Sequence, residues 1–384
     1  MQNIINSIKK SFSPEKIVQP GIYQYLSPGD DPRNYRLHLR VEDDGNGILI
    51  INASTILHLN QTATEYAYFL INNASPEIVA KHISRRYKVQ PAVAKQDYLD
   101  LSERIQDLIN TPDLDPVTFL DMERVVPFSG HISAPYRLDC AITYRLPGQD
   151  DPKSAPTERV KKELDTSEWI KIIDKAWSIG IPHIVFTGGE PTLRDDLPVL
   201  LQQTENNGQV SGLLTNGIRL SEPAYLKDLL LTGLDYVMIV YSDRKEVRDG
   251  LQACLKEDLF VSVHLTLKED NFETISRHIE EFQKVGVKGI SLSAHKQNLT
   301  SRLEILRNKI AELQLDLIWN LPVPYSSLNP IEFETDFKGK ISGEGKGWLY
   351  IEPDGDVLPA QDINHVLGNF LEDDWGIIWK GQNN

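Results

Sequence analysis

Cysteine is scarce in this sequence: its 384 residues include two, Cys140 and Cys254. Neither belongs to a CxxC-type pair, so the sequence predicts neither a structural zinc site nor a redox dithiol. A cubane iron–sulfur cluster takes about four donors, mostly thiolates. Two cysteines fall short of that number even if the fold brings them together. We therefore interpret both as small buried hydrophobic residues.

Long apolar runs and an excess of basic charge are also missing. No apolar run approaches the length of about 20 residues that a membrane-spanning helix requires. Residues 1–10 lack the apolar core of a signal peptide. The net charge of −15 opposes sequence-independent binding to phosphate backbones or anionic membranes. We expect a cytoplasmic protein that binds no nucleic acid and does not insert into a membrane.

The sequence divides into regions, because 384 residues exceed the usual size of one compact domain. The first region, residues 20–110, begins with short alternating segments that are typical of a small antiparallel sheet. Three amphipathic helices follow, one of them with Ser75 as its N-cap before Pro76. This order predicts a winged-helix-like module. Its predicted elements are strands 36–41, 47–52 and 55–59 and helices that begin near residues 60, 75 and 90.

Residues 111–134 are rich in helix- and strand-breaking residues, and we interpret them as a linker. Residues 135–330 alternate apolar strands with amphipathic helices, which predicts an α/β fold with a parallel sheet. At this period the fold is a partial (β/α) barrel of about six strands. The predicted strands are 137–144, 183–188, 210–215, 235–241, 260–267, 288–293 and 315–319. The predicted helices are 166–180, 193–207, 221–232, 244–257, 272–286 and 299–312.

Polar motifs follow two of these strands, after residues 188 and 215. Ligands of parallel sheets bind at the C-terminal strand ends, where Glu190 is placed to pair with an ammonium group. We favour the alternative that the Glu190 turn only caps strand and helix and that Thr215-Asn-Gly217 is an ordinary turn. The candidate binding residues are Thr187, Gly188, Gly189, Glu190, Thr215 and Asn216.

With the preceding strand, 135–145, which ends in Thr-Tyr-Arg, these motifs resemble the radical S-adenosylmethionine (radical SAM) superfamily. The resemblance implies that the Glu190 motif contacts the amino group of S-adenosylmethionine. It also implies a CxxxCxxC loop after the Thr-Tyr-Arg end, whose thiolates hold a [4Fe–4S] cluster. This sequence has Leu146, Asp150 and Lys153 at those three positions.

Residues 340–380 are predicted to form a small appendage with a β-hairpin that turns at Pro353-Asp-Gly355. This tail resembles the auxiliary-cluster (SPASM-like) extension that follows many radical SAM barrels. In that family cysteines stand before the hairpin and just after it, where this sequence has Ser342 and Ala360. The resemblance therefore implies a degenerate extension that has lost its metal ligands.

The first region resembles the PqqD-like family, which recognises precursor peptides of ribosomally made, modified natural products. The residues that carry the resemblance are Leu57-His-Leu-Asn60, the helix segment 75–87 and the closing helix. It implies that a leader peptide binds by adding a strand to a sheet edge.

The missing thiolates lead us to expect no cofactor. A [4Fe–4S] cluster has no ligands at the expected positions, and S-adenosylmethionine owes much of its affinity in this superfamily to the cluster. Retained binding of S-adenosylmethionine at Glu190 is the alternative. The histidines show no metal-ligand spacing, so we expect no metal site and interpret His183 and His264 as packed or surface groups.

Our preferred hypothesis is a radical-SAM-fold pseudoenzyme that lacks [4Fe–4S] ligands and binds a peptide or protein partner. The partner is a precursor peptide or an active radical SAM enzyme, and the role is recognition, scaffolding or regulation in peptide modification or in cofactor or natural-product maturation. Two alternatives stay open. The barrel performs non-radical chemistry at Glu190, with or without S-adenosylmethionine, or the chain is a structural subunit of a larger complex.

Overall fold

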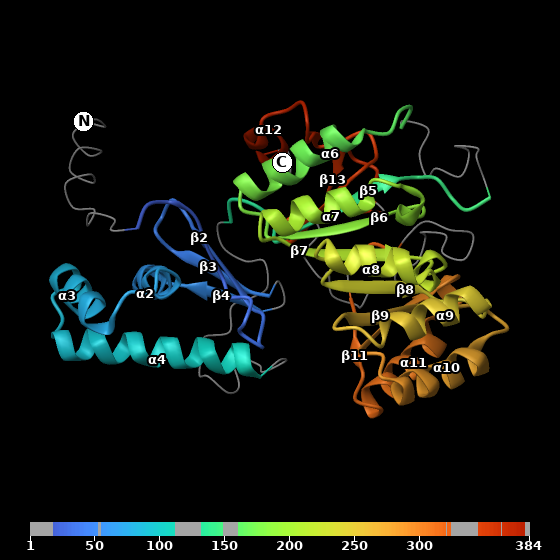
Figure 1. Ribbon diagram of the computed structural model, residues 1–384, viewed down its shortest axis with the longest axis horizontal. Coiled ribbons are helices and arrows are strands. Elements are labelled where there is room, and N and C mark those ends of the chain that lie inside the picture. Colours follow the sequence, from blue (N-terminus) through green and yellow to red (C-terminus); the bar gives the residue numbers. More distant parts are fainter. Residues whose placement is uncertain are drawn as a thin grey trace. The chain divides into compact units, whose positions relative to one another are not determined.

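The computed structural model describes residues 18–52, 55–111, 132–148, 160–319, 321–323, 345–361 and 363–380. Three of the predicted ligand positions, Asp150, Lys153 and Ser342, lie outside the described residues, as does most of the predicted linker, 112–131. The chain divides into two units, Met1–Ile132 and Ser133–Asn384. Each unit has its own sheet and hydrophobic core (Figure 1).

The smaller unit is a four-stranded antiparallel sheet with three helices. The strands pair in the order β1-β2-β3-β4, and one face of the sheet packs its apolar residues, such as Leu39 and Leu49, against Ala67 and Ile105 of the helices. The elements are β1 (Gly21–Leu26), β2 (Arg36–Val41), β3 (Gly47–Ile51), β4 (Thr55–Leu59), α2 (Gln61–Ile71), α3 (Pro76–Tyr87) and α4 (Pro91–Asn110).

Three strands and all three helices of this unit follow the sequence prediction, and β1 does not. Asn60 begins α2, since its side chain accepts a hydrogen bond from the backbone N–H of Ala63 at 2.9 Å. Strand β1 is half-exposed along most of its length, so it lacks the alternation that marks a strand in sequence. Its pairing with β2, from Gly21 opposite Val41, defines it as an edge strand.

The larger unit is built on a ten-stranded sheet in the order β11-β10-β9-β8-β7-β6-β5-β12-β13-β14. Strands β5 to β11 are all parallel and follow chain order. The predicted strands agree with them to within two residues at each end, which confirms the α/β prediction of a partial barrel. These strands are β5 (Arg137–Thr143), β6 (His183–Gly188), β7 (Val210–Thr215), β8 (Tyr236–Val240), β9 (Phe260–Leu267), β10 (Gly289–Ala294) and β11 (Asp316–Leu317).

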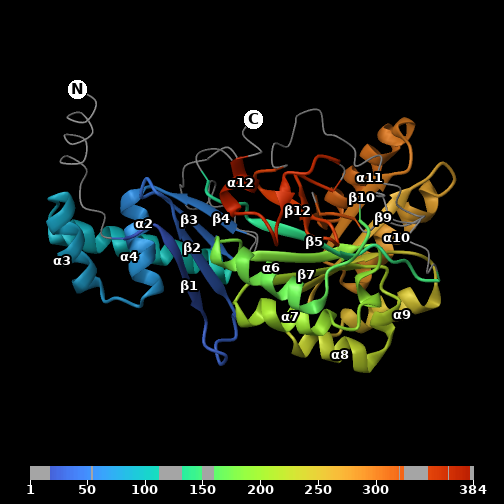
Figure 2. The ribbon, with the colours of Figure 1, turned by 90° about the horizontal axis from the view of Figure 1, so that it is seen from above.

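Helices cover one face of this sheet, as Figure 2 shows for α7 to α9. Their buried residues, such as Trp169 and Leu200, join Ile184 and Phe186 of β6 in one continuous core. Among the described residues, no helix is long and apolar enough to cross a membrane. The helices are α6 (Thr166–Ser178), α7 (Leu197–Asn206), α8 (Pro223–Leu231), α9 (Lys245–Cys254), α10 (Phe272–Val285) and α11 (Thr300–Glu312), with short 3-10 turns at Pro191–Leu193, Arg219–Ser221 and Gln297–Leu299.

The C-terminal hairpin extends the barrel sheet at its β5 edge. β12 (Trp348–Ile351) pairs with β5 in parallel, and β13 (Asp356–Leu358) returns antiparallel to β12. The N–H of Gly355 donates to the carbonyl of Glu352 at 2.9 Å, so the hairpin turns where the sequence predicts it. β14 (Gly368–Asn369) and α12 (Trp375–Lys380) complete the described tail.

Candidate functional site

The candidate residues lie on the concave face of the barrel sheet and at its C-terminal edge. In β6, Ile184 and Phe186 enter the helix-side core. Because side chains alternate along a strand, Val185 and Thr187 face the opposite side, and Val185 packs there with Leu214 of β7. We call this side of the sheet, opposite the helices, the concave face.

Glu190 stands at the centre of a hydrogen-bonded cluster between the ends of β6 and β7. Its side chain is 2% exposed. Oε1 accepts hydrogen bonds from the hydroxyls of Thr192 and Thr215, each at 2.6 Å, and from the N–H of Thr192 at 3.1 Å. Oε2 accepts one bond, from the N–H of Asn216 at 2.7 Å. The structure thus brings three predicted residues, Glu190, Thr215 and Asn216, together.

The two glycines before Glu190 are required by the neighbouring strand. A Cβ on Gly188, whose φ is +131°, would lie 2.1 Å from the carbonyl oxygen of Thr143. A Cβ on Gly189 would lie 2.3 Å from the carbonyl oxygen of Arg145. Backbone hydrogen bonds from Gly189 to Thr143 and from Glu190 to Arg145 join the exits of β5 and β6. Close approach between two backbones explains these glycines without a ligand.

Burial raises the pKa of the Glu190 carboxyl above its usual value, although the hydrogen bonds from Thr192, Thr215 and Asn216 act in the opposite direction. Among the described residues, all the groups that bond it are neutral. A carboxylate oxygen has room for two donors, and in this part of the chain Oε2 has one. The site therefore fits the ammonium group of an amino acid, which would supply both a further donor and a compensating charge.

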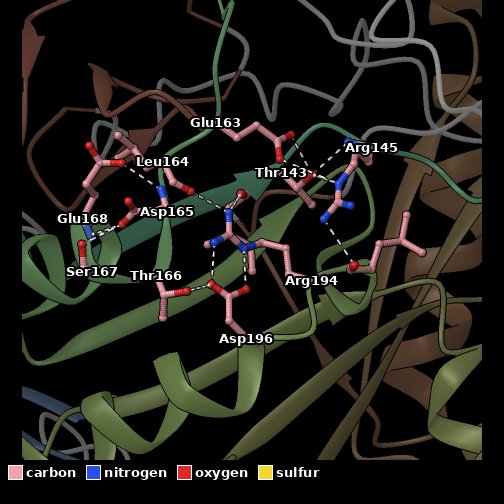
Figure 3. Close-up of polar contacts among 12 residues, drawn as sticks. Thr143, Arg145, Glu163, Leu164, Asp165, Thr166, Ser167, Glu168, Arg194 and Asp196 are labelled. Carbon is pink, nitrogen blue, oxygen red and sulfur yellow. Dashed lines mark hydrogen bonds and ion pairs between the residues drawn. The ribbon is translucent and has the colours of Figure 1, made fainter.

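A second carboxylate, Glu163, bonds residues at the C-terminal end of β5. The sequence analysis did not predict this role. One oxygen accepts bonds from the Thr143 hydroxyl at 2.7 Å and from the Tyr144 N–H at 2.8 Å. The other oxygen lies 3.8 Å from Nε of Arg145. Glu163 thus links the end of β5 to the segment just before α6 (Figure 3). The capping box of Asp165 and Glu168, which sets the start of α6, was the sequence signal that could have located it.

Arg194 joins the exits of β5 and β6, and it too was missed. It is 7% exposed, and its Nη1 donates to the carbonyls of Ile142 at 3.0 Å and Leu164 at 2.9 Å. Its guanidinium also forms a bidentate ion pair with Asp196, which in turn accepts a bond from Thr166 at 2.6 Å (Figure 3). Arg194 therefore holds β5, α6 and the Glu190 turn in one arrangement.

Thr187, another candidate residue, contacts the chain itself. Its hydroxyl donates to the carbonyl of Pro322 at 3.1 Å. Val323, the next residue, is buried against the concave face with Leu214 and Met238. A short segment from beyond the barrel strands thus lies next to the candidate site, and the sequence analysis assigned no role to it.

The far side of the concave face carries a neutral polar cluster. His264 of β9 is 1% exposed, and its ring nitrogens lie 2.9 Å from the hydroxyls of Ser291 and Ser293 of β10. Burial lowers the pKa of His264 to about 3, so the ring is uncharged at neutral pH. The interpretation of His264 as a packed residue agrees with this geometry.

An acidic group lies in the C-terminal hairpin. Oxygen atoms of Glu352, Asp354 and Asp356 come within 4.8 Å of one another, and the Tyr144 hydroxyl donates to Glu352 at 3.1 Å. Such oxygens suit hard cations, but acidic clusters are common without an ion, so we assign no metal here. Ala360, one of the predicted lost ligand positions, is buried after β13.

The two thiols do not fit a thiolate-held cluster. Cys140 is a fully buried residue of β5 in the helix-side core, and Cys254 is the last residue of α9 in the same core. Burial raises the pKa of Cys140 well above its usual range and that of Cys254 to about 12. Leu146, the first of the predicted ligand positions, is half-buried and has no donor atom.

Residues 140–240 match the family model described as the Radical SAM superfamily. A curated relative, a PqqA peptide cyclase of Granulibacter bethesdensis (strain ATCC BAA-1260 / CGDNIH1), is 26% identical over 283 residues, which are 65% of this chain and 75% of the relative. Part of the larger unit is thus similar to the Radical SAM superfamily model, and the chain is similar to that peptide cyclase.

Solved structures of Streptococcus suis SuiB share the fold. SuiB bound to precursor peptide SuiA aligns with a TM-score of 0.58 at 15% identity, over 93% of this chain and 88% of the other. SuiB bound to S-adenosylmethionine aligns with a TM-score of 0.57 at 15% identity, over 92% and 88%. The radical SAM fold prediction is confirmed. The PqqD-like identity of residues 20–110 and the degeneracy of the cluster loop stay predictions.

The expectation of no cofactor is contradicted. The matched family is named for S-adenosylmethionine, its model covers Cys140 as well as Glu190, and a protein of the same fold is described with S-adenosylmethionine bound. The physical reason for the error is that the expectation rested on thiols alone. The candidate residues at the ends of β6 and β7 offer carboxylate, hydroxyl and backbone groups, and their arrangement does not depend on cysteine.

Proposed function

We propose that this protein binds S-adenosylmethionine at the Glu190 cluster and recognises a precursor-type peptide, as a recognition or regulatory subunit in peptide maturation. The observation that carries the proposal is the buried carboxylate of Glu190 at the C-terminal edge of a radical SAM domain. Buried carboxylates are rare unless they are paired or functional.

The residues around Glu190 have different roles in holding the cofactor. Glu190 would hold the ammonium group of the cofactor, while Thr192, Thr215 and Asn216 keep its carboxylate in place. Thr187, Gly188 and Gly189 lie just before Glu190 at the end of β6 and complete the set of candidate residues. S-adenosylmethionine supplies a sulfonium-activated carbon when it is bound.

Peptide recognition is assigned to residues 20–110. In the sheet of this unit β1 and β4 are the edge strands, and an extended peptide can add to such an edge through backbone hydrogen bonds. The likeness to SuiB with its precursor peptide and the homology to a PqqA peptide cyclase support a peptide partner. They do not favour the alternatives of non-radical chemistry or a purely structural subunit.

The finer part of the proposal is that the chain is a pseudoenzyme. Its support is the sequence of the loop after β5, where Leu146, Asp150 and Lys153 stand at the three positions that carry cysteine in the radical SAM superfamily. Such a protein presents a bound peptide to a partner enzyme and does not itself cleave S-adenosylmethionine.

The cofactor site is tested by isothermal titration of S-adenosylmethionine into the wild type, Glu190→Gln and Glu312→Gln. Glu312 is exposed at the end of α11, which makes it a matched control. We expect binding to the wild type and the control, and at least about tenfold weaker binding to Glu190→Gln, the equivalent of about 1.4 kcal/mol. No binding to the wild type would refute the cofactor site.

The pseudoenzyme is tested separately, on protein isolated without oxygen, supplied with iron and sulfide and then with reductant and S-adenosylmethionine. We expect S-adenosylmethionine to remain intact. Formation of 5′-deoxyadenosine in stoichiometric amounts would overturn the pseudoenzyme and leave the cofactor site standing.

A further inference from the structure

One face of helix α3 in the smaller unit is basic. Lys81 and Arg85 stand one turn apart on this face, and Lys88 ends the helix three residues later. These three residues are here called the basic stripe, and all of them are exposed. In the described part of the chain, none of their side chains forms an ion pair or a hydrogen bond.

The opposite face of α3 holds the helix in its unit. Val79 and Ile83 are buried there and pack with Ala94 and Tyr98 of α4, the helix beside it in Figure 1. Because buried and basic residues alternate at helical spacing, the basic stripe faces away from this core.

The acidic residues near the basic stripe have other partners. Glu77 stands one turn before it, but Oε1 of Glu77 lies 2.8 Å from Nζ of Lys95 in α4. Oε1 of Glu65 lies 2.8 Å from Nε of Arg86. Residues 81–88 contain four Lys or Arg and no Asp or Glu. Like charges one turn apart repel each other, so this face gains from an external anion.

The stability of the helix does not account for the whole basic stripe. Cations in the last turn of a helix interact favourably with its dipole, which explains Arg85. Lys81 lies before the last turn, where this effect has decayed. Lys88 has a φ of +55° at a position where glycine is the usual residue. The chain therefore places a cation where glycine is less strained.

The spacing of the basic stripe fits a short acidic segment. At 1.5 Å per residue its three positions span about 10 Å along the helix. Alternate residues of an extended peptide lie on one side, about 6.6 Å apart, so alternating carboxylates are within reach of these long side chains. Ile78 and Val89, at the two ends, are 52% and 39% exposed and offer apolar contacts.

The same surface does not suit a membrane or a nucleic acid. A helix that lies on a membrane needs a continuous apolar face, and that face of α3 is buried against α4. Single-stranded nucleic acids stack on aromatic side chains, and neither the basic stripe nor its exposed neighbours Ile78 and Val89 include one. The net charge of −15 also opposes a polyphosphate partner.

We propose that the basic stripe of α3 binds an acidic segment of a peptide partner, with Ile78 and Val89 contacting apolar residues on either side of the acidic ones. The inference rests on the proposed function in that the partner is a peptide. The surface lies on a helix and is separate from the edge strands β1 and β4, so it adds charge recognition to strand addition.

The test uses the full chain and a synthetic fluorescent probe, Leu-Ser-Glu-Ser-Glu-Ser-Glu-Ser-Leu, with a control probe in which Gln replaces each Glu. Binding is measured by fluorescence anisotropy at an ionic strength of about 0.1 M. The Debye length is then about 10 Å, which screens the distant acidic charges of the chain. We expect the acidic probe to bind at least about tenfold more tightly than the control probe.

The position of the charges is tested with two double variants. Lys81→Glu with Arg85→Glu should weaken binding of the acidic probe at least about tenfold. Lys227→Glu with Lys256→Glu is the matched control, because both residues are exposed in the larger unit and the net charge changes equally. This control should bind the probe as the wild type does.

Circular dichroism checks that each variant is folded, and Lys81→Ala with Arg85→Ala replaces the charge reversal if that variant is not. Equal binding of the acidic probe to the wild type and to a folded stripe variant would overturn the inference, as would equal weakening in the matched control. Tighter binding of a single-stranded oligonucleotide or of phosphatidylcholine–phosphatidylserine vesicles would also overturn it. So would sedimentation that shows a dimer dependent on the basic stripe.

Failure of this inference is distinguishable from failure of the proposed function. If the acidic probe did not bind, the basic stripe would be refuted, while peptide recognition at the edge strands and the cofactor site would stand. If S-adenosylmethionine did not bind the wild type, the cofactor site would be refuted. The result for α3 would not change, since α3 and Glu190 belong to different units.

Discussion

The exits of β5 and β7 repeat one local arrangement. At each, a carboxylate accepts bonds from a threonine hydroxyl and from the next backbone N–H: Glu163 from Thr143 and Tyr144, and Glu190 from Thr215 and Asn216. Both threonine hydroxyls also accept a bond from the N–H two residues further on, at 3.1 Å and 3.2 Å. The same short motif thus closes two parallel strands.

Burial separates the two exits. The side chain of Glu163 is 28% exposed and lies near a guanidinium, whereas Glu190 is 2% exposed and receives hydrogen bonds from neutral groups. A partly solvated carboxylate that ties a loop needs no ligand. A buried carboxylate with spare accepting capacity gains from a cation, which is why we place the cofactor at Glu190 and assign Glu163 a structural role.

The largest effect should come from Arg194, which connects the exits of β5 and β6. Arg194→Met removes the donors to Ile142 and Leu164 and leaves Asp196 without its ion-pair partner. We expect a loss of about 3 kcal/mol in the free energy of unfolding, measured by urea denaturation. The exposed Arg302→Met is the control and should cost at most about 0.5 kcal/mol. Equal losses in the two variants would show that Arg194 does not hold β5, α6 and the Glu190 turn together.

Glu190→Gln should be next in size. The amide nitrogen replaces one acceptor oxygen, so a donor such as the Asn216 N–H or a threonine hydroxyl faces another donor. We expect a loss of about 2 kcal/mol in the free energy of unfolding, in the range for a buried group left without its partner. Urea denaturation in the absence of S-adenosylmethionine measures it. A substitution without effect on stability would contradict the buried, hydrogen-bonded geometry of Glu190.

The pH dependence of the free energy of unfolding should also distinguish Glu190 from a glutamine at this position. Because its folded pKa is raised above 4.5, the stabilisation associated with its protonation is present below the unfolded pKa and is lost as pH rises through the folded pKa. The stability advantage of the wild type over Glu190→Gln should therefore widen as the pH is lowered from 8 toward 5, by at most about 1.4 kcal/mol per unit. Parallel denaturation curves at several pH values test this. If the difference in unfolding free energy between the two proteins narrowed as the pH falls, the pKa of Glu190 would be lowered by folding and not raised.

The smallest effect should be that of Glu163→Gln. The side chain of Glu163 is 28% exposed and can bond water, so we expect a loss of about 1 kcal/mol or less. S-adenosylmethionine affinity should match that of the wild type. If Glu163→Gln weakened cofactor binding as much as Glu190→Gln does, the distinction between the two exits would fail.

Most of the fold was predicted from the periodicity of apolar residues along the chain. Strands β5 to β10 are short, mostly apolar segments, each with a helix after it, and burial on both faces makes that pattern hard to mistake. β1 was missed because a half-exposed edge strand has no such pattern. The sequence also could not predict that β12 pairs with β5, because no local pattern marks which strand a distant hairpin will join.

The candidate site was predictable only in part. Glu190 and Thr215 were found because Glu190 follows β6 and Thr215 ends β7, and both strands end at the same edge of the sheet. Arg194 and the segment 321–323 were missed, because an arginine in a polar turn and a short Leu-Pro-Val segment look like ordinary surface and loop sequence. The prediction of no cofactor was wrong because it considered thiolate ligands alone. It left out the carboxylate, hydroxyl and backbone groups at the ends of β6 and β7.

The order of apolar strands and helices along the chain was enough to specify a parallel barrel, since burying such strands on both faces leaves few other arrangements. Which of the two carboxyl groups is buried and which stays partly solvated was decided by packing, because Glu163 and Glu190 look alike as residues and differ in what surrounds them. The contact of Thr187 shows the same thing, because only the folded chain brings Pro322 to it from 135 residues away in sequence.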